Sequence, residues 1–204
     1  YKSTDGGATW RRTLGDDAWV GATDLVIDPR DPDRLYAATW QRHRTVANYM
    51  GGGPGSALYR SEDGGEHWTK LTEGLPKGAM GKIGLAISPH RPDVVYAAIE
   101  LDRRKGGVFR SSNRGASWEK RSDTVSGGTG PLYACPHTFD RLYLADVRIQ
   151  VSDDGGKTFR KLGEKNKHSD NHALAFRSDD PDYLLAGCDG GVYESFDLAE
   201  NWRF

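Results

Sequence analysis

The sequence predicts an all-β fold that is built from repeated four-stranded units. A ten-residue motif with Ser at its third position recurs along the 204 residues, and short apolar segments followed by turns rich in Pro and Asp recur between its copies. Hydrophobic content is low at 36%, and glycine is frequent at 26 residues, which suits many short strands and tight turns. A repeat of this kind indicates one supersecondary unit per copy, so the units must pack on one another to bury a core.

One copy of the motif, YRSEDGGEHW at Tyr59, illustrates its local chemistry. The residues on both sides of it alternate as strands do, so we expect the copy to form the turn of a β-hairpin. Asp63 can accept hydrogen bonds from backbone N–H groups just ahead of it, while Gly64 and Gly65 supply backbone angles that a side chain resists. We expect the ring of Trp68 to be buried against the hairpin. The motif predicts turn formation and packing, with no reacting group.

The other copies are YKSTDGGATW, FRSSNRGASW, QVSDDGGKTF and YESFDLAENW. Asn113 replaces the Asp in one copy, Ala199 replaces the Gly in another, and Phe159 replaces the Trp in a third. The residues that we expect to build these turns are Ser3, Asp5, Trp10, Ser61, Asp63, Trp68, Ser111, Asn113, Trp118, Ser152, Asp154, Phe159, Ser195, Asp197 and Trp202.

The chain divides into a half unit, residues 1–14, and four units at about 15–73, 74–121, 122–163 and 164–204. Each full unit has an inner strand, a turn, a second strand, a third strand, the motif and a fourth strand. An Asp ends each of the four turns, where we expect it to hydrogen-bond locally to the next strand. These residues are Asp33, Asp93, Asp140 and Asp182.

The repeated motif resembles the Asp-box, or BNR (bacterial neuraminidase) repeat, of sialidases, xyloglucanases and sortilin-type proteins. In those families the box joins the third and fourth strands of a β-propeller blade, on the face away from the ligand site. The resemblance therefore implies a partial β-propeller of about four and a half blades, with the Asp-boxes between strands three and four. It also implies that the chain is one segment of a larger propeller, whose remaining blades are partners.

Longer segments extend the resemblance to secreted bacterial BNR-repeat proteins, which are often labelled glycosyl hydrolases. They include YAATWQRHR at Tyr36, GKIGLAISPHRPDVVYAAIE at Gly81 and HSDNHALAFRSDDPDYLLAGCDGGVYESFD at His168. The resemblance implies an extracellular or periplasmic setting. The arginine-containing Arg-Ile-Pro motif of sialidases is not present in the sequence.

The composition argues against several other classes of protein. Lys and Arg number 28 against 29 Asp and Glu, so no basic field favours nucleic acid. No apolar run is long enough to span a membrane, and we expect no cofactor. The two cysteines, Cys135 and Cys188, favour buried free thiols over a disulfide, because two cysteines make no disulfide framework.

A long insert, residues 40–56, follows a second strand and maps to the face opposite the boxes. It carries Trp40, Arg42, His43, Arg44 and Tyr49 before a glycine-rich stretch. Aromatic rings and guanidinium groups suit stacking on sugars or holding an anionic group. The alternative is a solvated surface loop with the Trp lying over its blade.

The segment His168-Ser-Asp-Asn-His172 enters an inner strand on the same face. If it is extended, His168, Asp170 and His172 share one side and are a weak candidate for a metal site. The alternative is a turn Asp flanked by two hydrogen-bonded histidines.

Acidic residues near the ends of strands could supply the two carboxyl groups that glycoside hydrolysis needs. The catalytic candidates are Asp170, Asp189, Asp146 and Glu100, and Asp24 belongs to the same set. Two hypotheses follow. The first is a non-catalytic propeller module that binds a glycan or peptide through the loop face, with Trp40, Arg42, His43, Arg44, Tyr49, His168 and His172 as ligand-binding residues. The second is a part of a glycoside hydrolase that uses paired carboxylates on that face.

Overall fold

The computed structural model describes residues 1–15, 17–101, 105–124 and 130–204, and the predicted all-β fold is confirmed: these residues form strands and no helix. Three sheets have four antiparallel strands, and a fourth has three strands with an added bridge between Glu194 and Arg203. The first sheet contains β1 (Val20–Asp28), β2 (Asp31–Gln41), β5 (Ala57–Ser61) and β6 (Thr69–Leu71). The second contains β7 (Ile83–Ile87), β8 (Val95–Glu100), β9 (Gly106–Ser111) and β10 (Glu119–Ser122).

The third sheet contains β11 (Leu132–Ala134), β12 (Leu142–Leu144), β13 (Gln150–Ser152) and β14 (Arg160–Lys161). The fourth contains β15 (Asn171–Phe176), β16 (Leu184–Cys188) and β17 (Gly191–Ser195). A small hairpin of β3 (His43–Arg44) and β4 (Tyr49–Met50) lies inside the insert of the first sheet. Residues 1–14 form a further hairpin, held by paired backbone hydrogen bonds between Lys2 and Arg11.

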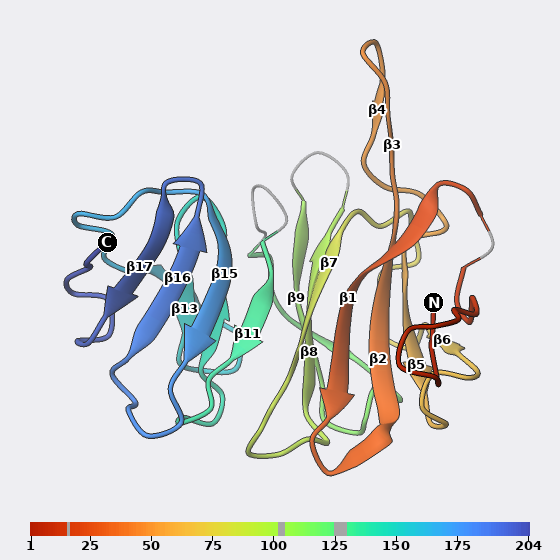
Figure 1. Cartoon of the computed structure of the whole chain (residues 1–204), viewed down its shortest axis with the longest axis horizontal. Coiled ribbons are helices and arrows are strands. Elements are labelled where there is room, and N and C mark those ends of the chain that lie inside the picture. The colour runs from red at the N-terminus through yellow and green to blue at the C-terminus, as the bar shows by residue number, and fades with distance from the viewer. Residues whose placement is uncertain (16, 102–104, 125–129) are drawn as a thin grey trace.

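The four sheets stand side by side as the blades of a β-propeller, with each sheet packed face to face on the next (Figure 1). Each of three apolar clusters joins one pair of neighbouring blades. Tyr36 and Leu58 of the first blade pack with Leu85 of the second. Equivalent clusters join the second blade to the third and the third to the fourth. The core therefore lies between blades, so no single blade can bury its apolar surface alone.

Each Asp-box is a closed hydrogen-bonded turn between the third and fourth strands. In the box of the first blade, the Ser61 hydroxyl accepts the N–H of Gly65 at 2.8 Å and donates to Asp63 Oδ1 at 2.8 Å. Asp63 Oδ1 in turn accepts the N–H of His67 at 2.9 Å. The other boxes have the same bonds, and in the exceptional copy Asn113 keeps the acceptor role through its Oδ1.

Two consecutive left-handed residues shape every box. They are Gly6 and Gly7, Gly64 and Gly65, Arg114 and Gly115, Gly155 and Gly156, and Leu198 and Ala199. The N–H of the first residue of the pair donates to the carbonyl of the Asp that ends the Pro/Asp turn of the same blade, as from Gly64 to Asp33 at 2.9 Å and from Gly155 to Asp140 at 2.8 Å. The turn Asp therefore docks the box of its own blade through its backbone, in place of the local side-chain bond to the next strand that the sequence predicted.

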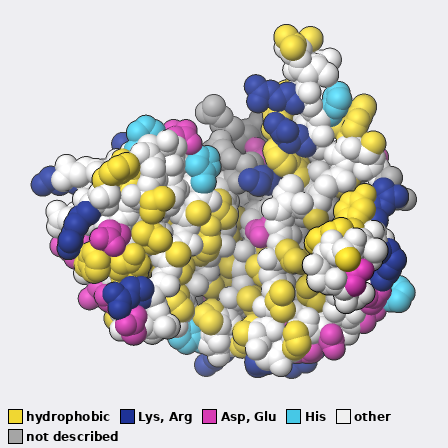
Figure 2. Space-filling view, in the orientation of Figure 1, with side chains coloured by type: hydrophobic (Ala, Val, Ile, Leu, Met, Phe, Trp, Pro, Cys, Tyr) yellow, Lys and Arg dark blue, Asp and Glu magenta, His cyan; other side chains and the backbone are white. Residues whose placement is uncertain are grey.

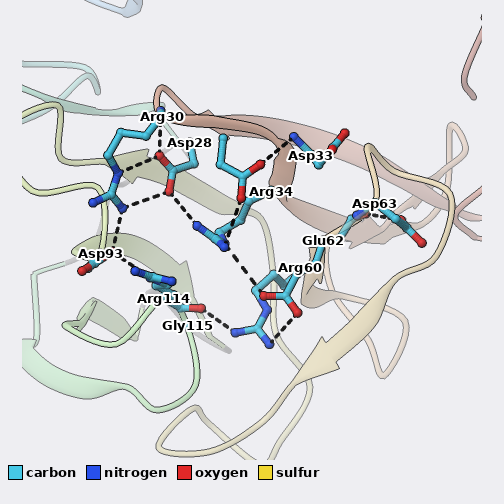
Figure 3. Close-up of polar contacts among 12 residues, drawn as sticks. Asp28, Arg30, Asp33, Arg34, Arg60, Glu62, Asp63, Asp93, Arg114 and Gly115 are labelled. Atoms are coloured by element: carbon cyan, nitrogen blue, oxygen red, sulfur yellow. Dashed lines mark hydrogen bonds and ion pairs between the residues drawn. The ribbon is translucent and has the colours of Figure 1, made fainter.

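On the box face, charged side chains tie the first blade to the second (Figure 3). Asp28 is fully buried and accepts hydrogen bonds from the guanidinium groups of Arg30 and Arg34. Arg30 also reaches Asp93 of the second blade at 2.6 Å, and Asp93 pairs with Arg114 at 2.7 Å. The Arg30–Asp93 pair crosses the interface between the two blades, while the other pairs hold Arg30 and Asp93 in place within their own blades.

The prediction that the aromatic ring of the box is buried holds only in part. Trp118 and Trp202 are buried, with exposed fractions of 6% and 4%, because each packs on the preceding blade. Trp10 is 63% exposed, because it lies on the hairpin at one end of the arc. Both cysteines are free thiols, and Cys135 is buried while Cys188 is partly exposed.

Candidate functional site

The edge of the blades opposite the boxes collects the chemistry-bearing residues, and we call this edge the loop face. Strands β2 and β8 run towards it and end near Trp40 and Glu100. Asp146 and Asp189 follow β12 and β16 at the same edge, whereas the boxes follow β5, β9, β13 and β17, which run the other way. Figure 1 shows this edge uppermost, with the β3–β4 hairpin projecting from it.

The insert of the first blade forms an aromatic and cationic cluster on the loop face. The guanidinium of Arg42 lies 5.3 Å from the ring centre of Trp40 and 5.8 Å from that of Tyr49. The Trp40 indole N–H donates to the carbonyl of Gly51 at 2.8 Å, which fixes the ring against the glycine-rich stretch. His43 stacks on Trp19, with ring centres 4.4 Å apart, and Arg44 is exposed in the hairpin. Figure 2 shows basic and hydrophobic side chains gathered along this hairpin and at its base.

The glycine-rich stretch joins the insert to the second blade. Gly53 pairs with Met80 through a backbone hydrogen bond of 3.0 Å. A Cβ added at Gly52 would come within 2.6 Å of the carbonyl oxygen of Met80, so a side chain at this position would push the two blades apart. Glycine is therefore needed here for the close approach of two backbones.

A first pocket of about 430 Å³ opens between the insert and the second blade. Tyr49, the glycines at 51 and 52, and the segment from Ala79 to Gly81 line it together with Glu100. Glu100 is half-buried there, and this burial raises the pKa of its carboxyl, although a hydrogen bond from the N–H of Lys82 opposes the shift. The pocket thus places one carboxyl of altered acidity beside an exposed aromatic ring.

A second pocket of about 150 Å³ lies between the third and fourth blades. Its lining brings together Asp146, Asp170 and His172, with Lys82 from the second blade. His172 Nε2 lies 2.5 Å from Asp189 Oδ1, which places that candidate carboxyl next to the same pocket. The loop face thus holds Glu100 in one pocket, and Asp146 and Asp170 in the other.

Asp24 is held by backbone hydrogen bonds and lines neither of these two pockets. Its carboxylate accepts the N–H of Leu25 at 2.8 Å and the N–H of Leu85 in the next blade at 2.7 Å. Burial raises the pKa of Asp24, and these backbone bonds oppose the rise. With both oxygens bonded to backbone, Asp24 joins the inner strands of two blades.

The metal candidate at His168, Asp170 and His172 requires an extended backbone, and the structure does not have one at Asp170. Asp170 has a left-handed backbone with φ of 60°, and β15 begins only at Asn171. His168 Nδ1 bonds to the carbonyl of Ser169, whereas His172 faces Asp189. Among the described residues, no group of three His, Cys, Asp or Glu side chains is arranged to hold a metal ion.

A buried network that the sequence analysis missed supports the second pocket. The Lys167 side chain is fully buried, and its ammonium donates to the His168 carbonyl at 2.7 Å, to Asn171 Oδ1 at 2.5 Å and to Glu164 at 3.3 Å. Glu164, whose side chain is 4% exposed, also accepts from Asn171 Nδ2 at 2.9 Å. Asn171 donates to the carbonyl of Asp146 at 2.9 Å, so the network holds the corner that carries two of the pocket's carboxyls.

Comparison with known proteins agrees with this architecture. A model of the BNR/Asp-box repeat matches residues 1–12. The chain is 26% identical over 191 residues to a probable oligoxyloglucan-reducing end-specific xyloglucanase of Neosartorya fischeri, covering 83% of this chain and 22% of that protein. It is 30% identical over 149 residues to a xyloglucanase of a Paenibacillus species, covering 63% of this chain and 14% of that protein.

A solved structure with the same fold is the GH74 enzyme of Niastella koreensis, with a TM-score of 0.61 at 21% identity over 90% of this chain and 30% of that one. The chain thus spans less than a quarter of the length of these two curated relatives. No helix of the described residues is long and apolar enough to cross a membrane. The repeated boxes, the radial four-stranded blades and these similarities lead to one conclusion: the chain has the fold of a β-propeller segment built from Asp-box (BNR) repeats, and it is similar to xyloglucanases.

Proposed function

We propose that the loop face binds a plant-type β-glucan glycan of the xyloglucan class, with the insert of the first blade as its main contact. The observation that carries the proposal is the first pocket, where Tyr49 and Glu100 line one cavity beside the Arg42–Trp40 pair. A pyranose ring presents an apolar C–H face and several hydroxyl groups. The exposed ring of Tyr49 can stack on the C–H face, and the carboxyl of Glu100 can hydrogen-bond to the hydroxyl groups.

The ligand class comes from the relatives, since the two curated proteins described above are xyloglucanases. A peptide in extended conformation is the other ligand expected from the sequence. The pocket favours a glycan because one exposed aromatic ring and one carboxyl line it. An extracellular or periplasmic setting, where such a glycan would be met, is part of this proposal.

The test is titration calorimetry of the 204-residue protein with a xyloglucan heptasaccharide. Tyr49→Ala should weaken binding about tenfold, because each lost aromatic contact of this kind is worth roughly 1.4 kcal/mol. Trp10→Ala is the matched control, since Trp10 is equally exposed at 63% but lies in a box. Equal loss in both variants, or no binding by the unaltered protein, contradicts the proposal.

A second function, hydrolysis of that glycan, is favoured by the raised pKa of Glu100. A carboxyl that stays protonated to higher pH suits a general acid, and Asp146, Asp170 or Asp189 would supply the partner carboxylate. Glu100→Gln should then abolish turnover in a reducing-end assay on xyloglucan while leaving heptasaccharide binding within about twofold. Turnover that survives this substitution excludes Glu100 as the acid.

A further inference from the structure

Arg42 lies between β2 and β3, at the base of the projecting hairpin, and differs from most other arginines of the chain in its contacts. Most arginines pair with an acidic side chain, as Arg30 pairs with Asp28 at 3.2 Å. The exposed guanidinium of Arg42 instead lies over the rings of Trp40 and Tyr49, and no carboxylate of the described residues pairs with it. A guanidinium that lies over a ring keeps the N–H donors at its edge, and these can bind a ligand.

The surroundings of Arg42 are fixed by bonds within the chain. Its backbone N–H donates to the carbonyl of Trp19 at 2.9 Å, and the next residue, His43, stacks on the ring of Trp19. The indole N–H of Trp40 donates to the carbonyl of Gly51 at 2.8 Å, which holds the ring under the guanidinium. Because the backbone and one ring are already in place, less conformational freedom is lost when an anion binds.

The end of the loop face beside the insert carries an excess of positive charge. The ammonium of Lys82 lies 5.9 Å from the centre of the Trp40 ring that Arg42 also contacts. Glu100 is the acidic residue in the described lining of the first pocket; burial raises the pKa of its carboxyl, and the charge of Lys82 opposes that rise. Figure 2 shows Lys and Arg side chains gathered at the base of the hairpin. Two cations thus face one half-buried carboxyl, which attracts an anionic group to this end.

The other end of the loop face carries the opposite charge. Asp146 and Asp170 line the second pocket, and Asp189 lies beside it through its contact with His172 at 2.5 Å. Lys82 reaches this pocket as well, so three carboxylates stand against one lysine and one histidine. A ligand with many anionic groups would be repelled there. The charge distribution therefore suits a glycan with an anionic group at one place, next to the insert.

We propose that the insert recognises a sugar residue that carries a carboxylate, as a uronic acid does, and that Arg42 is the residue that selects it. The planar fork of a guanidinium matches a carboxylate through two parallel N–H···O bonds, while the sugar ring stacks on the exposed ring of Tyr49. The inference deepens the glycan proposal and rests on it, because the acidic sugar would be one end or one branch of that glycan.

The probe is cellobiouronic acid, in which glucuronic acid is joined to glucose by the cellobiose linkage. Its reference is cellobiose, which differs only in having a hydroxymethyl group in place of the carboxylate. Each disaccharide is titrated into the 204-residue protein at low salt while the NMR signal of the Trp40 indole N–H is followed. We expect a Kd at least about tenfold lower for the acidic disaccharide, and a preference that shrinks as salt is added, because salt screens an exposed ion pair.

Three variants sharpen the test. Arg42→Gln should reduce the preference for the acidic disaccharide to about twofold or less, and Arg42→Lys should keep part of it, because the charge remains but the planar fork is lost. Arg91→Gln is the matched control: Arg91 is also exposed, and its guanidinium lies 4.7 Å from the ring centre of Phe139, but it belongs to a Pro/Asp turn on the box face. It should leave the preference unchanged. Equal loss in Arg91→Gln would mean attraction by net charge alone and would overturn the proposal.

The outcomes separate this inference from the glycan proposal. Equal Kd values for the two disaccharides overturn the inference, while binding of the xyloglucan heptasaccharide in the same experiment leaves the glycan proposal standing. A preference that depends on Arg42, found together with no binding of the heptasaccharide, supports the acidic-sugar site and contradicts the neutral ligand class. Equally tight binding of cellobiose sulfated at the same carbon atom shows a general anion site and overturns the assignment to a carboxylate.

Discussion

The two left-handed residues of each box differ in how tightly their neighbours surround them. A Cβ added at Gly7 would find its nearest neighbour at 3.7 Å, on Trp10, whereas one added at Gly156 would meet Val108 Cγ1 at 2.8 Å. Both glycines have φ near the left-handed region, at 91° and 85°. The two sites therefore separate backbone strain from crowding between blades.

Gly156→Ala should destabilise the protein more than Gly7→Ala. We expect about 1 to 2 kcal/mol of left-handed strain at either site, and about 1 to 3 kcal/mol more at Gly156 from overpacking. The free energies of unfolding in urea measure the difference. Equal losses would mean that the box of the third blade does not press on Val108.

Asn113 makes one box different in its response to pH. In the other boxes the carboxylate accepts a side-chain hydrogen bond as well, and this bond from Thr9 is the main reason that the pKa of Asp5 falls to about 2. Asn113 instead donates from Nδ2 to the Ser117 hydroxyl at 2.9 Å. Its box keeps the turn but has no carboxyl group.

Asn113→Asp should therefore add stability at neutral pH that disappears in acid. A carboxyl with a lowered pKa in the folded state stabilises above its unfolded value of about 4, and the gain is lost as the pH falls towards about 2. We expect a gain of roughly 0.5 to 1.5 kcal/mol at pH 7, from the hydrogen bond that Ser117 can donate. Urea unfolding of both proteins at pH 7 and pH 2 checks this, and a gain that persists at pH 2 contradicts it.

At the scale of elements, the repeated motif was sufficient to predict the β-hairpins and the four-stranded units, because a box depends on hydrogen bonds within eight residues. The conformation near Asp170 was not predictable in this way. Its left-handed backbone follows from Asp170 N–H donating to the carbonyl of Val147 at 3.0 Å, a bond to a different blade. The same holds for Lys167, which in sequence is one of several charged residues in a loop, whereas in the structure its ammonium lies over the ring of Trp202 and bonds to Asn171.

Lys167→Met should destabilise the loop of residues 163–171 and the blade that follows. The substitution leaves the buried carboxylate of Glu164 without its ammonium partner, but Arg148 still lies 3.5 Å from its other oxygen, so we expect a loss of less than the about 3 to 5 kcal/mol that an uncompensated buried charge costs. Lys165→Met, at an exposed position in the same loop, is the control and should change the free energy of unfolding by less than about 0.5 kcal/mol. The double variant Lys167→Met with Glu164→Gln should recover part of the loss. Additive losses would mean that the two side chains do not interact.

At the scale of the whole molecule, the box face and the loop face carry different kinds of residue contact. The box face holds the buried carboxylate of Asp28 with its guanidinium partners, the partly exposed Arg30–Asp93 pair that ties the first blade to the second, and the closed turns. The loop face holds the projecting insert, the two pockets with their half-buried carboxyls, and His172. The box face thus carries structural bonds and the loop face carries accessible polar groups, which is the main physical reason to place ligand binding on the loop face.

Hydrogen–deuterium exchange with and without a xyloglucan oligosaccharide tests this separation most directly. We predict slower exchange of backbone amides in residues 40–56 and 79–82 and near Glu100 when the glycan is bound. Residues 61–68 and 111–118, which form boxes on the box face, should exchange at unchanged rates. Protection of the boxes with no change in the insert would contradict the account.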